Sequence, residues 1–142
     1  LAAVLRYPGR DWADFGGAFV NDHPVLAKVC DDGDRRGDRA PVLVAHTTAA
    51  FAERHLADPA AASAEVAAAV RELLALPRPA VEAFVHRWTY AQPAGPAPAQ
   101  TCFHLDDAGV GLAGDAFGPA RVQTAWLSGH LLGSALARRL RG

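Results

Sequence analysis

The sequence predicts an α+β fold, because strand-like segments and helical patterns occur together in one chain of 142 residues. Residues 41–46 are an apolar, β-branched run that is typical of an interior strand. Residues 59–76 place apolar side chains on one face at steps of three and four, which predicts an amphipathic helix. Residues 121–140 predict a second helix, about 30 Å long.

The remaining strands are short and end at turn residues. They are predicted at residues 2–7, 18–20, 24–30 and 80–90, with two more at 101–105 and 109–113. Residues 80–90 alternate large side chains on both faces, so we expect both faces of that strand to be covered.

Helix signals follow the predicted interior strand. Thr48 is expected to cap a short helix that runs to about His55. Asp58 at the N-cap and Pro59 at the first helical position start the next helix, which should end before Pro77. Its core-facing side chains are predicted to be Val66, Val70, Leu73 and Leu74. Residues 31–40 hold four aspartates and three arginines and are predicted to be a solvated turn. A metal-binding acidic loop is disfavoured, because the arginines would neutralise the carboxylates.

Composition excludes several classes of protein. The net charge is −1, which gives no electrostatic case for nucleic acid or an anionic membrane as main partner. No apolar stretch approaches the ~20 residues of a membrane span. Two isolated cysteines, Cys30 and Cys102, are expected to be reduced thiols of a cytoplasmic protein. No Met occurs and residue 1 is Leu, so we expect an N-terminal part to be missing; one lysine, no isoleucine and abundant alanine favour a bacterial gene.

The last third of the chain carries the chemistry. A predicted buried strand at 110–113 runs into Gly114-Asp115, a glycine-containing loop and the long helix. Such a helix start can bind an anion or a polarised carbonyl, because its first N–H groups have no intrahelical partner. The Asp115 carboxylate can accept a hydrogen bond from a sugar hydroxyl. Small residues recur every four positions along the helix, which suits either a flat ligand or an ordinary close helix–sheet contact: Ala125, Gly129, Gly133 and Ala137.

Residues 114–129, Gly-Asp-Ala-Phe-Gly-Pro-Ala-Arg-Val-Gln-Thr-Ala-Trp-Leu-Ser-Gly, resemble the C-terminal flavin-binding motif of the FAD-dependent amine oxidase and renalase-like superfamily. Residues 85–93, Val-His-Arg-Trp-Thr-Tyr-Ala-Gln-Pro, resemble a strand segment of the bacterial NAD(P)/FAD-dependent renalase-like oxidoreductases. Segments 17–22 and 46–58 also fit that group.

The resemblance implies the C-terminal portion of an FAD-dependent oxidoreductase with a small-molecule substrate and NAD(P)H as a candidate co-substrate. Residues 1–92 would belong to the substrate domain, an antiparallel sheet with flanking helices that roofs the flavin. Residues 93–100 would be a connection. Residues 101–142 would be the C-terminal strand and long helix of a Rossmann-like FAD-binding domain whose N-terminal part, with Gly-x-Gly-x-x-Gly, is missing. The portion alone is not expected to be active.

The resemblance also implies site residues. The cofactor-binding positions would be Gly114, Asp115, Arg121, Val122 and Gln123, and the pocket candidates are Trp88, Tyr90 and Arg121, with no catalytic residue assigned. Asp115 would contact the ribityl or pyrophosphate part, and the N–H near Val122 would face flavin N1 and C2=O. Many members carry Glu where this chain has Gln123. Arg121 stands where amine oxidases commonly have an aromatic residue, which disfavours a protonated amine and favours an anionic or dinucleotide substrate.

Two other functions are alternatives to an FAD-dependent oxidoreductase. A non-enzymatic α+β binding or interaction module stays open as the alternative. Hydrolase chemistry at Ser128-Gly129-His130 lacks a Gly-x-Ser-x-Gly elbow. The six histidines show no metal-ligand spacing, so no metal is expected, although His86 and His104 lie on predicted neighbouring strands.

Overall fold

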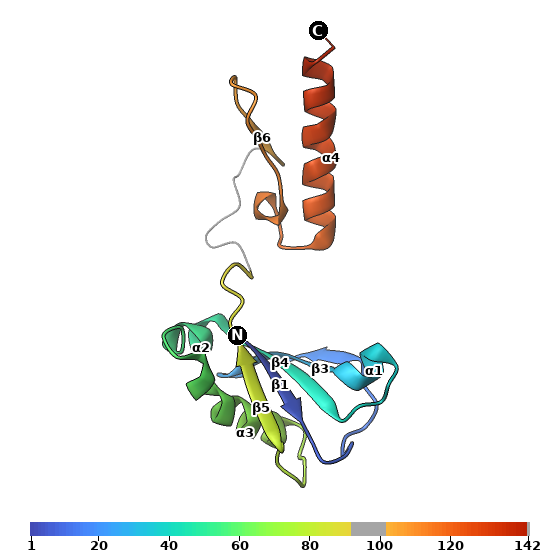
Figure 1. The fold of residues 1–142 in the computed structure, drawn as a ribbon, viewed down its shortest axis with the longest axis vertical. Helices are drawn as coiled ribbons and strands as arrows, with labels where there is room; N and C mark the ends of the chain where they lie inside the picture. Colours follow the sequence, from blue (N-terminus) through green and yellow to red (C-terminus); the bar gives the residue numbers. More distant parts are fainter. Residues whose placement is uncertain (92–101, 142) are drawn as a thin grey trace. The chain divides into compact units, whose positions relative to one another are not determined.

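A five-stranded antiparallel sheet forms the first part of the chain (Figure 1). The computed structural model describes residues 1–91 and 102–141 and divides the chain into unit 1, Leu1–Thr89, and unit 2, Tyr90–Gly142. The predicted α+β class is confirmed. The predicted connection at 93–100 lies outside the described residues, and the assignment of either unit to a substrate or FAD domain stays a prediction.

The strands of unit 1 are arranged in the order β2-β3-β4-β1-β5, and every neighbouring pair is antiparallel. Their bounds are β1 Ala2–Arg6, β2 Gly17–Phe19, β3 Leu26–Asp31, β4 Val42–Thr47 and β5 Glu82–His86. The β-branched run of β4 lies in the middle of the sheet, as its sequence predicts. The expectation that both faces of β5 are covered is wrong, because its Val85 side packs on the core while Phe84, on the other side, is 59% exposed.

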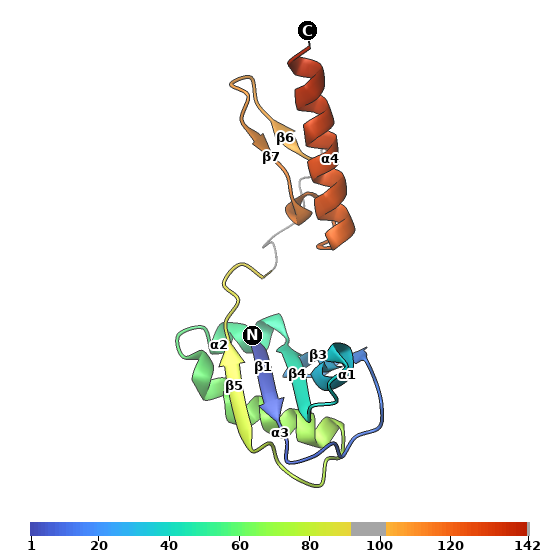
Figure 2. The ribbon, with the colours of Figure 1, turned by 45° about the vertical axis from the view of Figure 1, so that its right-hand side comes forward.

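Helices cover one face of this sheet. They are α2 Ala49–Arg54, the 3₁₀ turn η1 Pro59–Ala62 and α3 Ser63–Leu73, while the short α1, Asp32–Arg36, directly follows β3. Figure 2 shows α3 running behind the strands, and it contacts β1, β3, β4 and β5. The core between them consists of apolar side chains from the inner sheet face and from α2 and α3: Ala3, Leu5, Val29, Leu43, Ala45, Val85, Phe51, Val66 and Val70.

The ends of these helices confirm part of the predictions. The Thr48 hydroxyl accepts a hydrogen bond from the Phe51 N–H at 3.2 Å and caps α2. Asp58 caps η1 rather than a long α-helix, and α3 ends at Leu73, three residues earlier than predicted. The chain leaves the helix because Ala75 adopts a left-handed conformation with φ +50°. Leu73, the last residue of α3, is 42% exposed, contrary to the prediction.

The charged segment 31–40 is not simply a solvated turn, because Asp31 is fully buried. Its carboxylate accepts hydrogen bonds from both terminal nitrogens of Arg10, at 2.8 and 2.5 Å, and from Trp12 Nε1 at 2.8 Å. It also caps α1 by accepting from the Asp34 N–H at 3.0 Å. Burial opposes ionisation of Asp31, but these donors outweigh it and lower the pKa to about 2 from the ordinary 3.8.

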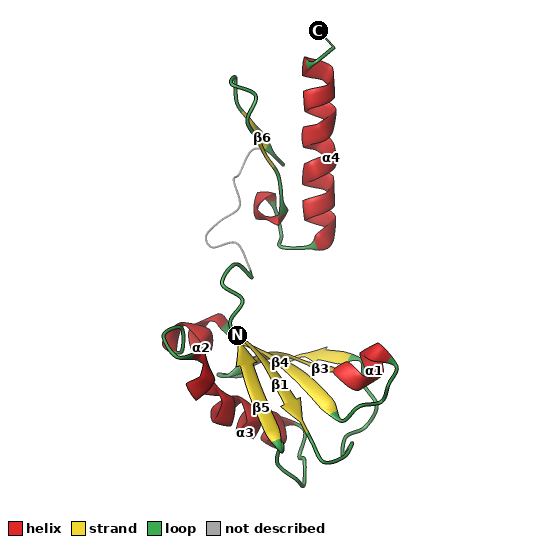
Figure 3. Ribbon diagram, in the orientation of Figure 1, coloured by secondary structure: helices red, strands yellow, loops and turns green. Residues whose placement is uncertain are grey.

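Unit 2 is a two-stranded hairpin and a long helix (Figure 3). Its elements are β6 His104–Leu105, β7 Gly111–Leu112, the 3₁₀ turn η2 Asp115–Phe117 and α4 Val122–Arg139. The predicted hairpin and the predicted long helix are confirmed. The expectation of a buried strand at 110–113 is wrong, since Val110 and Leu112 are 56% and 58% exposed. His86 and His104, predicted to lie on neighbouring strands, belong to different sheets. Among the described residues, no helix is long and apolar enough to cross a membrane.

We expect Asp31→Asn to lower the free energy of unfolding of unit 1 by about 2–3 kcal/mol, because Arg10 loses its buried counter-charge and keeps only the exposed Asp14. The depressed pKa means that the carboxylate stabilises the fold above pH ~4 and that this contribution, about 2 kcal/mol, is lost as the pH falls toward 2. Urea titrations between pH 2 and 7 measure both effects. Asp14→Asn is the matched control: Asp14 also pairs with Arg10 but is 69% exposed, so a change below about 1 kcal/mol is expected. Equal losses in the two variants would contradict the role of Asp31.

Candidate functional site

The segment from Gly114 to the first turn of α4 forms a fixed, tight turn. Gly114 has φ +152°, a conformation that side chains disfavour, and its N–H donates to Ser128 Oγ at 3.0 Å. Ser128 is 1% exposed, so the middle of α4 anchors the turn. Sequence reasoning missed this role of Ser128 because a helical serine carries no signal by itself.

The loop before α4 is held by a second contact. The Thr124 hydroxyl donates to the Pro119 carbonyl at 2.6 Å. A Cβ at Gly118 would lie 2.9 Å from Thr124 Cγ2, so a glycine is needed for this close approach. The two contacts together fix the loop against the start of the helix.

The first turn of α4 presents unused hydrogen-bond donors. Arg121 precedes the helix in an extended conformation and makes no capping side-chain hydrogen bond, and the first intrahelical bond is donated by Ala125 to the Arg121 carbonyl. The N–H groups of Val122, Gln123 and Thr124 therefore have no intrahelical partner. The helix dipole adds a partial positive charge there, which favours an anion or a polarised carbonyl.

Asp115 begins η2, which contacts α4, and the neighbouring Gly114 is hydrogen-bonded to Ser128 in that helix. Within the described residues its half-buried carboxylate has no hydrogen bond and no ion pair. A Cβ built at Gly114 would meet nothing within 4 Å, so the space beside the turn is open. The predicted cofactor positions Gly114, Asp115, Arg121, Val122 and Gln123 thus form one continuous segment with free donors and a free acceptor.

The second group of predicted residues belongs to the end of β5. Trp88 is 62% exposed, and its ring lies edge-on to His86 with centroids 4.4 Å apart. Tyr90 is 97% exposed at the beginning of unit 2. Trp88 therefore belongs to unit 1, whereas Arg121, the third pocket candidate, belongs to unit 2.

Trp88 extends a surface that sequence reasoning did not identify, the sheet face opposite α3. We call it the open face and define it by Phe19, Lys28, Val44, His46, Val4, Phe84 and His86. Register places Lys28 beside both Phe19 and His46, and the Lys28 ammonium lies 5.4 Å from the Phe19 ring centroid. Burial and the nearby Lys28 charge lower the pKa of His46. The open face combines apolar, aromatic and basic side chains.

No family model matches this chain, and no curated protein sequence matches it.

We expect Ser128→Ala to loosen the Gly114 turn, because the Gly114 N–H loses its acceptor. Amide hydrogen exchange by NMR should show at least about tenfold faster exchange at Gly114, equivalent to about 1.4 kcal/mol. Ser134→Ala is the control, since Ser134 lies on the same helix and its hydroxyl has no hydrogen bond among the described residues. Unchanged exchange in Ser128→Ala would show that the turn does not depend on the serine.

Proposed function

We propose that this chain is the C-terminal portion of a cytoplasmic, bacterial FAD-dependent oxidoreductase. The proposal depends on one observation: Gly114, the free Asp115 carboxylate and the unpaired N–H groups of α4 form one segment, in a sequence that resembles a flavin-binding motif. The half-buried Cys30 and exposed Cys102 are free thiols, which agrees with a reducing compartment.

The residues present fit one end of a flavin. The N–H groups of Val122 and Gln123 suit the carbonyl at C2 and the negative charge that develops near N1. The Asp115 carboxylate suits a ribityl hydroxyl, and the open space at Gly114 admits a ligand close to the backbone. When bound, FAD supplies a two-electron acceptor for substrate oxidation. The ADP part would be held outside this chain, because its Gly-x-Gly-x-x-Gly match at 109–114 spans a hairpin turn and β7 and does not itself join a strand to a helix.

The open face is the proposed wall of the substrate pocket, with Trp88 at its margin. Its aromatic side chains would exclude water and pack against a planar substrate. Lys28 has no ion pair among the described residues, whereas Glu82, two residues before Phe84 on β5, pairs with Arg6 at 2.9 Å. A protonated amine finds no free counter-charge on such a surface. An anionic substrate or a dinucleotide such as NAD(P)H suits it better.

One observation suits the alternative, a non-enzymatic binding or interaction module, as well as it suits the enzyme. On α4 the side opposite Ser128 is apolar and uncovered within unit 2: Val122, Trp126 and Leu140 are 87%, 68% and 86% exposed. Gly129 and Gly133 lie on this side and have nothing within 4 Å of a built Cβ, so the small residues do not form a contact inside unit 2. A partner protein would bury this surface in the module, whereas the FAD-binding half would bury it in the enzyme.

In the complete enzyme we expect Asp115→Ala to weaken FAD binding about ten- to hundredfold, because a carboxylate–hydroxyl hydrogen bond contributes about 1.5–3 kcal/mol. Fluorescence titration of the apoprotein with FAD measures the change. Asp107→Ala is the control, since Asp107 lies in the β6–β7 turn, away from the helix start. If FAD affinity is the same in both variants, Asp115 is a turn residue only.

Arg121→Gln should lower the flavin reduction potential in the complete enzyme. A positive charge at the start of α4 favours the more negative, reduced form of the cofactor, and a two-electron couple moves by about 30 mV for each 1.4 kcal/mol. Dye equilibration measures the potential, with Arg138→Gln, in the last turn of α4, as the control. An unchanged potential in Arg121→Gln would remove this side chain from the mechanism.

A further inference from the structure

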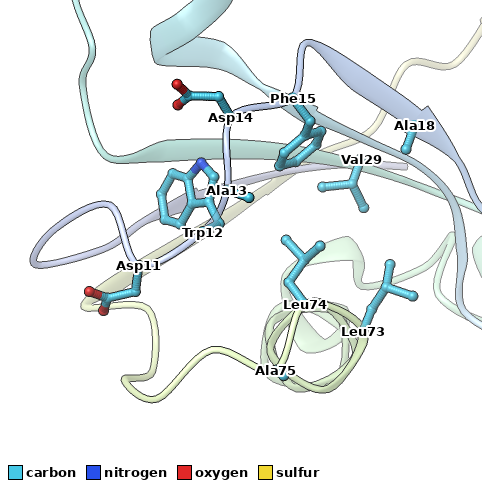
Figure 4. A pocket seen from close by; sticks show the side chains of 10 residues that line it. All are labelled: Asp11, Trp12, Ala13, Asp14, Phe15, Ala18, Val29, Leu73, Leu74 and Ala75. Carbon is cyan, nitrogen blue, oxygen red and sulfur yellow. The ribbon is translucent and has the colours of Figure 1, made fainter.

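Unit 1 contains a pocket of about 500 Å³ on the helix-covered side of its sheet (Figure 4). Its apolar lining comes from the loop before β2, from β2 and β3, and from the end of α3: Trp12, Phe15, Ala18, Val29, Leu73 and Leu74. In Figure 4 the side chains of Trp12, Phe15, Val29 and Leu74 surround a common space. The pocket lies on the opposite side of the sheet from the open face. It is therefore separate from the proposed substrate wall, and none of its lining residues belongs to the proposed flavin-binding segment of unit 2.

No free charge faces this space. Asp11 and Asp14 belong to the lining, but Figure 4 shows both carboxylates directed away from the centre. Asp11 accepts two hydrogen bonds from Arg78, both at 2.6 Å, and Asp14 accepts one from Arg39 at 2.9 Å. A charged ligand would lose its hydration in the pocket without gaining a partner.

The aromatic wall is held in place before any ligand binds. Trp12 donates its indole N–H to the buried Asp31 at 2.8 Å and packs edge-on against the buried Tyr7 ring, with centroids 5.3 Å apart. The Arg10 guanidinium lies 5.3 Å from the centroid of the indole on which it packs. A wall that is already ordered loses little conformational entropy when a ligand binds.

The mouth of the pocket leaves an apolar side chain in water. Leu73 continues the apolar face of α3 and yet is 42% exposed, because the helix ends there. A ligand seated between Phe15 and Leu73 would cover this side chain. The exposed leucine marks the side of the pocket that an apolar ligand would cover.

We propose that this pocket binds a small, uncharged aromatic molecule. Its volume lies within the range of about 300–1,000 Å³ found for small-molecule sites, and an aromatic ring packs favourably beside Trp12 and Phe15. The site is formed by unit 1 alone and does not depend on the proposed flavin function.

The probe for the test is N-phenyl-1-naphthylamine, an uncharged aromatic whose fluorescence rises in apolar surroundings. Titrated into the complete 142-residue chain, it should bind saturably, with one molecule per chain, and quench tryptophan emission. Ala18→Phe fills the pocket from β2, and Leu73→Gln makes its mouth polar; each should weaken binding at least about tenfold. Both side chains are exposed, so the folded state should tolerate the changes, which circular dichroism verifies.

Phe84→Gln is the matched control, because Phe84 is an exposed aromatic residue on the open face of the same sheet. Its probe affinity should equal that of the unmodified chain. The proposal is overturned if the probe does not bind saturably. It is also overturned if Phe84→Gln weakens probe binding and Leu73→Gln does not, since the probe would then occupy the open face. If Ala18→Phe does not fold, Leu73→Gln alone decides. Adding FAD should leave the titration unchanged, so its outcome is separate from that of the flavin proposal.

Discussion

The arrangement of unit 1 depends on one buried ion pair. Asp31 is completely buried at the end of β3, and the Arg10 side chain that binds it is only 14% exposed. A buried carboxylate is tolerated only when its hydrogen-bonding capacity is used, and Arg10, Trp12 and the Asp34 N–H together supply the donors. The same four contacts attach the loop before β2 to the sheet and start α1. Removing the carboxylate would therefore disturb the loop, the helix and the aromatic wall of the pocket together.

The sheet that this ion pair supports has two different faces. One face packs on α2 and α3 and forms the core, while the open face keeps Phe19 and Phe84 at 80% and 59% exposed, beside the basic Lys28. Within unit 2, α4 shows the same asymmetry. Its Ser128 side packs on the turn, and its Trp126 side is exposed. Apolar surfaces of this kind are typical of binding surfaces. The proposed enzyme would use both, the first toward substrate and the second toward its FAD-binding half.

Much of the fold could be predicted, because local signals decide it. The β-branched run of β4, the Thr48 cap and the long α4 all depend on near neighbours in sequence. Asp31 could not be recognised as buried, because a segment rich in aspartate and arginine has the composition of a solvated loop. Its partner Arg10 is also 21 residues away in the sequence. The position of β5 at the sheet edge depends on strand order, which its alternating pattern does not encode.

The candidate site was predictable in the same uneven way. Gly114 and Asp115 stand out because glycine next to an acidic residue before a helix is a local signal, and in the structure they open η2, which contacts α4. Ser128 and the open face were missed, since both depend on contacts or register between distant residues.

The central claim is that this chain forms part of a flavoenzyme, and cofactor content tests it most directly. The protein expressed from the complete reading frame should purify yellow, with a bound-flavin absorption spectrum at one FAD per chain. The 142-residue chain alone should purify without FAD, since the proposed ADP-binding half would lie outside it. A complete protein that is colourless and does not take up added FAD would contradict the account and leave the interaction module as the better explanation.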